Sequence, residues 1–198
     1  FGAVHRAHAS VSKLPELMPN AAGLLIDREL SAMNHVLHSA EKPFVAILGG
    51  AKVKDKIGVI ENLIPKVDAV LIGGAMTYSF LKSQGEGIGQ SLSDDENLEL
   101  AVKIQEKARE LNTPLFLAND HIIADRFEKD AEHKVVGKIP EGWMGMDIGP
   151  DTVQSFKKII REASTVVWNG PMGVFEWEPF SKGTVEVAKA CLLYTSPS

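Results

Sequence analysis

The sequence predicts an α/β fold in which a parallel sheet is covered by helices on both faces, a Rossmann-like arrangement of three layers. Short apolar runs alternate with amphipathic helical patterns along the chain, which is typical of such a sheet. Residues 44–48 and 69–72 are continuous apolar runs, and each is followed directly by two glycines. Runs of this kind are typical of strands that are buried on both faces.

Composition excludes several classes of protein. The chain has 198 residues and a formal net charge of −5, with a pI near 5.7, so it lacks the positive charge of a general nucleic-acid binder. Its one cysteine, Cys191, cannot form an internal disulfide, which favours a reducing compartment. No apolar run reaches the ~18 residues of a membrane span. The first residue is Phe1 with no signal peptide, so we expect a piece of a longer chain.

The first expected element is a helix over residues 27–39, which we expect to join two structural regions. Leu30, Met33, Val36 and Leu37 share one face of it. After it come the two strands named above and a series of further elements. In chain order these are helices at 53–64 and 76–82, a helix from a Ser-x-x-Glu capping box at 93–96 through Leu111, a strand at 115–117, an irregular stretch with short strands at 121–150, a helix around 153–160, a strand at 165–168 and a helix at 185–192.

The loops that follow the strands are the expected ligand site, because open parallel sheets bind ligands beyond the carboxyl ends of their strands. Lys52 and Lys56 are four residues apart near the expected start of a helix, so we expect them on one helical face. Two cations there oppose the helix dipole and repel each other, whereas an anion such as a polyphosphate reverses both effects. The alternative is that both lysines are solvated surface residues. Neither G-x-x-x-x-G-K-[ST] nor G-x-G-x-x-G occurs, so the mode of nucleotide binding stays open.

Two other segments are candidates. Residues 169–176 follow the last strand, and their small and apolar side chains can wall a flat ring while Glu176 accepts hydrogen bonds from a ribose. The alternative there is a turn with a solvated glutamate. His5, Arg6 and His8 form a basic cluster that suits a small anionic ligand, or else a surface cluster. No third ligand accompanies the two histidines, so a metal site is not expected.

Five segments together resemble the phosphoglycerate kinase family. They are FGAVHRAHAS at 1–10, LGGAKVKDK at 48–56, IGG at 72–74, GWMGMDIGP at 142–150 and VWNGPMGVFE at 167–176, and the resemblance runs in order from Phe1 to about Ala190. It implies a two-lobed kinase that moves a phosphoryl group between 1,3-bisphosphoglycerate with ADP and 3-phosphoglycerate with ATP. It also implies the Mg²⁺ complex of the nucleotide, a cytoplasmic monomer, and no nucleic-acid or membrane partner.

The resemblance implies a role for each matching residue. Arg6 resembles the arginine that binds phosphoglycerate, Lys52 the catalytic lysine that holds the phosphoryl group in transit, and Lys56 the lysine on the nucleotide phosphates. The other implied nucleotide-binding residues are Gly50, Ala51, Gly73, Gly74, Gly145, Met146, Asn169, Pro171, Val174 and Glu176. The implied division is the end of the substrate lobe at 1–26, a hinge helix at 27–40, an incomplete nucleotide lobe at 41–190 and a tail at 191–198. The nucleotide lobe is thus the truncated C-terminal lobe of the kinase.

The chain also departs from the family pattern. Ala75 stands where a third glycine is usual, and Ala118-Asn119-Asp120 stands for Pro-Val-Asp. The Gly-Gly-Gly-Asp loop, whose aspartate holds magnesium in the family, is missing after Ala190. We therefore expect this chain alone to be inactive. Two rivals are a dinucleotide-dependent oxidoreductase, which needs the absent G-x-G-x-x-G, and a non-catalytic nucleotide-binding module.

Overall fold

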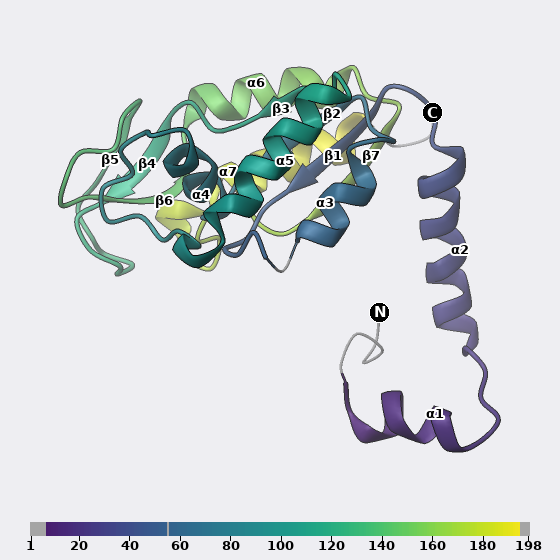
Figure 1. The fold of residues 1–198 in the computed structure, drawn as a ribbon. Helices are drawn as coiled ribbons and strands as arrows, with labels where there is room; N and C mark the ends of the chain where they lie inside the picture. Colours follow the sequence, from purple (N-terminus) through teal and green to yellow (C-terminus); the bar gives the residue numbers. More distant parts are fainter. Residues whose placement is uncertain (1–6, 55, 195–198) are drawn as a thin grey trace. The chain divides into compact units, whose positions relative to one another are not determined.

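The structure, a computed structural model, describes residues 7–54 and 56–194 and divides the chain into two compact units, Phe1–Ala40 and Glu41–Ser198 (Figure 1). The first unit holds a π-helical turn at Ala9–Lys13, the short helix α1 at Leu14–Leu17 and the helix α2 at Leu24–Ser39. The helix expected at 27–39 is therefore present and begins at Leu24, after an extended Gly23.

The second unit is built on a four-stranded parallel sheet in the order β3-β2-β1-β7. Its strands are β1 at Phe44–Leu48, β2 at Ala69–Ile72, β3 at Leu115–Phe116 and β7 at Thr165–Asn169. Every residue of β1 and β2 is buried, as the continuous apolar runs predict. The strands at the two edges are more exposed, because each has a neighbour on one side only.

Helices cover both faces of this sheet, so the predicted three layers are confirmed. Val45, Ile47 and Leu71 form one core cluster with Phe156 of α6, which spans Pro150–Arg161, and with Val187 of α7, which spans Lys182–Tyr194. Strand side chains alternate between faces, so the equally buried Ala46, Leu48, Val70 and Ile72 point to the opposite face. The helices α3 at Ile57–Leu63 and α5 at Leu98–Glu110 pack together on that side (Figure 1).

A second, antiparallel sheet forms within the stretch where the sequence indicates only irregular structure with short strands. Its order is β5-β4-β6, with β4 at His121–Ala124, β5 at His133–Val136 and β6 at Met144–Ile148. A bulge between Ile122 and Ile123 shifts the register of β4 against β6. Helix α4, at Met76–Ser83, carries Tyr78, which belongs to one hydrophobic cluster with Ile123 of β4.

Besides α2, three further helix starts differ from the prediction. Helix α3 begins at Ile57 and not at Val53, and Lys54 and Lys56 lie in turns ahead of it. Helix α7 begins at Lys182, ahead of the expected Val185. The capping box at 93–96 is wrong: a 3-10 turn at Asp95–Asn97 comes before α5, and the Ser93 hydroxyl donates to Asp95 instead of capping a helix.

Among the residues that the structure describes, no helix is long and apolar enough to cross a membrane.

Candidate functional site

A cavity of about 560 Å³ lies at the carboxyl ends of β1, β2 and β7, where the sequence predicts the ligand site. The segments after those strands form one wall, and β6 with its neighbouring loops forms another. Its size is in the range of small-molecule sites. The lining residues are Gly50, Ala51, Gly74, Ala75, Tyr78, Gln90, Leu92, Phe127, Met144, Gly145, Met146, Pro171, Met172, Gly173, Val174 and Glu176.

Backbone hydrogen bonds hold the three strand-ending loops together. The Gly50 N–H donates to the Pro171 carbonyl (3.1 Å), and the Gly74 N–H donates to the Met172 carbonyl (2.9 Å). Gly74 has a φ of +65°, and a Cβ there would lie 2.6 Å from the Gly50 nitrogen. At Gly74 the close approach is between loops, and the residue also lines the cavity.

The opposite wall is supported from behind by buried polar contacts. The Gly145 N–H donates to the Ser91 hydroxyl (2.8 Å), and a Cβ at Gly145 would collide with the Tyr78 hydroxyl. Burial and the charge of Asp147 raise the pKa of Tyr78 well above its usual range, so this phenol is neutral. Gly145 is thus explained by the close approach of the Tyr78 ring, which leaves no room for a side chain.

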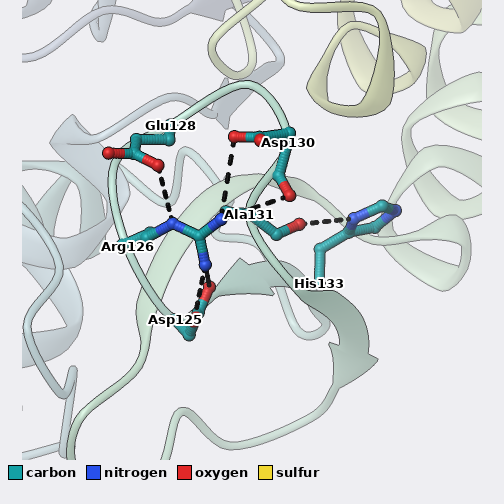
Figure 2. A network of polar contacts seen from close by, with 6 residues as sticks. All are labelled: Asp125, Arg126, Glu128, Asp130, Ala131 and His133. Carbon is teal, nitrogen blue, oxygen red and sulfur yellow. Dashed lines mark hydrogen bonds and ion pairs between the residues drawn. The ribbon is translucent and has the colours of Figure 1, made fainter.

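Arg126 fastens the loop between β4 and β5, from which Phe127 reaches the cavity. Its guanidinium contacts three carboxylates of the same loop (Figure 2): Glu128 at 2.7 Å, Asp125 at 3.1 Å and Asp130 at 3.7 Å. The Phe127 ring packs on Trp177, with 4.8 Å between centroids. Phe127 is 60% exposed and therefore stands at the margin of the cavity.

The lysines expected to meet phosphates do not line the cavity, although Lys56 approaches Gly50, which does. Lys56 Nζ donates to Asn169 Oδ1, and its Cε lies 4.0 Å from where a Cβ of Gly50 would stand. Lys52 is exposed in the turn that follows β1. The prediction that Lys52 and Lys56 share a helical face is wrong, because α3 begins only at Ile57.

Asp147 is a buried carboxylate directly behind the wall. It is 1% exposed, its Oδ2 accepts from the Gly183 N–H (2.7 Å) and its Oδ1 accepts from the Ile148 N–H (2.9 Å). Burial raises the pKa of Asp147 to about 7, against the opposing effect of these two backbone donors. A Cβ on Gly173, which lines the cavity, would lie 2.3 Å from Asp147 Oδ1.

The structure brings together most of the residues singled out from the sequence. Those that line the cavity are Gly50, Ala51, Gly74, Gly145, Met146, Pro171, Val174 and Glu176. Lys52, Lys56, Gly73 and Asn169 do not line it, and Gly73 packs instead on Met172. Arg6 lies outside the described residues.

Sequence reasoning missed several lining residues, namely Tyr78, Gln90, Leu92, Phe127, Met144 and Met172. Met144 and Met172 lie within the segments that carry the resemblance, so the signal existed there. Tyr78, Gln90, Leu92 and Phe127 reach the cavity through the packing of α4 and the small sheet, which no local pattern indicates. A second cavity of about 520 Å³, beside β5 and the start of α7, contains none of the predicted site residues.

Comparison with known proteins agrees with this architecture, a three-layer α/β domain whose cavity lies at the strand ends. The chain matches the sequence model of "Phosphoglycerate kinase" over residues 1–196. It is 50% identical to phosphoglycerate kinase of Thermosipho africanus over 199 residues, covering 99% of this chain and 50% of that protein. It is 51% identical to phosphoglycerate kinase of Deinococcus radiodurans, covering 96% of this chain and 46% of the relative.

Solved structures of phosphoglycerate kinases are also similar to this chain. The phosphoglycerate kinase of Coxiella burnetii superposes with a TM-score of 0.85 at 42% identity, over 88% of this chain and 46% of that one. The enzyme of Pyrococcus horikoshii gives 0.82 at 29% identity, over 98% of this chain and 50% of the other. The chain belongs to the phosphoglycerate kinase family. It spans about half the length of the relatives that it matches.

Proposed function

We propose that the whole protein catalyses reversible phosphoryl transfer between 1,3-bisphosphoglycerate with ADP and 3-phosphoglycerate with ATP, and that this chain supplies its nucleotide site. The observation that carries the proposal is the cavity at the strand ends, because eight of the residues that resemble the family's nucleotide site line it together. Family membership supplies the reaction class.

The chemistry of the cavity suits a nucleoside. Small and apolar residues, among them Gly145, Met146, Pro171 and Val174, offer a flat slot for a base. Glu176 is exposed at the same cavity, and its carboxylate can accept hydrogen bonds from ribose hydroxyls. We propose that the base lies against the β6 wall and the ribose on Glu176.

The phosphates are proposed to extend toward Lys56, Asn169 and Lys52. Phosphoryl transfer needs alignment of donor and acceptor and neutralisation of the charge on the moving group, with little covalent chemistry from the protein. Lysine ammonium groups supply that charge, Lys56 on the nucleotide and Lys52 on the group in transit. We propose that Mg²⁺ arrives as part of the nucleotide complex. Within the described residues, no group of three or more His, Cys, Asp or Glu is arranged to hold a metal ion.

The remaining features of the proposal rest on the family resemblance. Arg6 is the proposed ligand of 3-phosphoglycerate. The whole protein is proposed to be a cytoplasmic monomer that acts on small molecules and binds neither nucleic acid nor membrane.

The phosphate assignment is tested by titrating the 198-residue chain with ADP in a calorimeter. Lys56→Ala is expected to weaken ADP binding by about 10- to 150-fold, because a charged hydrogen bond to phosphate contributes roughly 1.5–3 kcal/mol. Lys54→Ala is the matched control, since Lys54 is an exposed lysine of the same loop and does not line the cavity. An unchanged affinity in Lys56→Ala would show that the phosphates lie elsewhere.

The second candidate is a nucleotide-binding module without turnover. This chain covers only about half the length of its relatives, which favours binding without turnover for the chain alone. We therefore expect it to bind ADP and to show no activity in a coupled kinase assay. Robust turnover by the purified chain would contradict that expectation, and turnover by the whole protein would decide against a non-catalytic parent.

A further inference from the structure

Asp147 lies behind the cavity wall, where β6, the loop after β7 and the start of α7 meet. It belongs to β6, whose Met146 lines the cavity, and its Oδ2 accepts the Gly183 N–H in the first turn of α7. Its Oδ1 lies directly behind Gly173, where any side chain would collide with it. A carboxylate at this place therefore touches β6, α7 and the loop after β7 together.

The same loop is attached to the two other parts by backbone donors. The Met172 N–H donates to Thr184 Oγ1 (3.0 Å), and Thr184 follows Gly183 in α7. The Val174 N–H donates to the Met146 carbonyl (2.9 Å), next to Asp147 in β6. The positions of Met172, Gly173 and Val174, which all line the cavity, thus depend on how β6 and the start of α7 are held relative to each other.

Net stability is not an obvious reason for a carboxylate at this place. It is almost fully buried, and the salt bridges of the described residues do not include it. Two backbone N–H groups and the positive end of the α7 dipole are what favour its charge. Burying a carboxylate costs free energy. A role in positioning neighbouring segments therefore explains Asp147 better than a gain in net stability does.

We propose that Asp147 is a positioning residue for the nucleotide: by joining β6 to the first turn of α7, it fixes the Met172–Val174 wall in the geometry that binds the base. It does not touch the nucleotide itself. The inference rests on the proposed function, because it assigns a role within that same site.

A second buried carboxylate offers a matched control. Asp120 is 6% exposed and accepts the Asp151 N–H (2.9 Å) and the Thr152 N–H (2.8 Å) in the first turn of α6. It lies behind Gly149 as Asp147 lies behind Gly173. Asp120 does not line the cavity, and neither do Asp151, Thr152 or Gly149. The two aspartates thus share burial, two backbone donors and a position at a helix start. They differ in that Asp120 also accepts from the Thr152 hydroxyl (2.6 Å) and that only Asp147 lies behind a residue of the cavity wall.

The experiment compares Asp147→Asn with Asp120→Asn in the 198-residue chain by urea unfolding, ADP titration and amide hydrogen exchange. Both variants are expected to lose stability, and Asp120→Asn at least as much as Asp147→Asn, because Asp120 has the additional Thr152 hydroxyl donor. Only Asp147→Asn is expected to weaken ADP binding, by about 10-fold, which corresponds to a wall that is in the binding geometry in about one tenth of the molecules. Without nucleotide, it is also expected to speed the exchange of the Met172, Val174 and Gly183 amides relative to amides in β1.

Several outcomes would overturn the inference. Equal ADP affinity in Asp147→Asn and the parent would do so, and so would equal weakening in Asp120→Asn. If the parent chain does not bind ADP, the proposed function fails, while unchanged exchange at Met172 and Val174 refutes the positioning role independently. If Asp147→Asn does not fold, Thr184→Val is the second variant. It removes the hydroxyl that accepts the Met172 N–H and keeps nearly the same side-chain volume. Unchanged ADP affinity in Thr184→Val would count against the inference.

Discussion

His121 shows how one buried side chain can make stability depend on pH. It is 3% exposed, and its Nδ1 has no hydrogen-bond partner in the described structure. Its ring packs on Tyr78, with 5.5 Å between centroids. Burial lowers the pKa of His121 to about 4, although the charge of Asp120 opposes the shift. The folded state therefore keeps a neutral ring where the unfolded state binds a proton.

This difference predicts the sign of the pH dependence. Between pH 6.5 and about 4 the unfolded chain binds a proton at His121 that the folded chain does not, so the free energy of unfolding falls as pH falls. His121→Phe is expected to lose less stability over this range, by up to about 1.4 kcal/mol per pH unit. Urea unfolding at pH 5, 6 and 7.5 measures the slope for the parent and the variant.

His133→Gln is the control, because His133 is an exposed histidine at the start of β5. This variant has one histidine fewer but keeps the buried His121. If the parent and His121→Phe show the same slope, the folded ring is protonated like an exposed one. At pH 7.5 we expect His121→Phe to be more stable by about 1 kcal/mol, since an unpartnered buried polar atom costs roughly 1–3 kcal/mol.

Among the elements, the ends of strands and helices are held by distant parts of the chain. The first turn of α6 donates to Asp120, the residue before β4, and the first turn of α7 donates to Asp147 of β6. Neither carboxylate is a near neighbour in the sequence. The three loops after β1, β2 and β7 hold each other by backbone hydrogen bonds. The local capping box at 93–96 forms no helix cap. Asp120 and Asp147, which no local pattern indicates as caps, accept N–H groups in the first turns of α6 and α7.

The loop packing predicts a large difference between two glycines with positive φ. Gly74 has a φ of +65° and a Cβ there would meet the Gly50 nitrogen at 2.6 Å, whereas Gly142 has a φ of +80° and open space around it. Gly142→Ala is expected to cost about 1–2 kcal/mol from backbone conformation alone. Gly74→Ala is expected to cost a further 1–3 kcal/mol from crowding, with weaker ADP binding.

Thermal and urea unfolding of the two variants measure this difference. Equal losses would mean that the loops after β1 and β2 separate easily, which would count against a preformed cavity.

At the scale of the whole molecule, the cavity belongs entirely to the second compact unit. Every lining residue lies between Gly50 and Glu176. The first unit, by contrast, exposes several large apolar side chains, including Leu17 at 82% and Leu24 at 89%. A unit with its own core is expected to fold alone.

We therefore predict that a chain covering residues 41–198 keeps the ADP affinity of the parent within about twofold and unfolds in one cooperative transition. Circular dichroism and calorimetry give both measurements. Loss of cooperative unfolding on removal of residues 1–40 would show that the second unit needs the first.

The sequence by itself determined the α/β class, because the apolar runs of β1 and β2 and the helical periods depend only on local pattern. It also determined the family, because several segments match in order, and the residues singled out within these segments make up half of those that line the cavity. What the tertiary structure decided is how these residues meet. The antiparallel sheet at 121–148, the wall formed by Tyr78 and Phe127, and the buried Asp147 depend on contacts between segments far apart in the chain. Local periodicity does not indicate such contacts. For the same reason it predicts Lys52 and Lys56 on a helix, whereas α3 begins at Ile57, after both lysines.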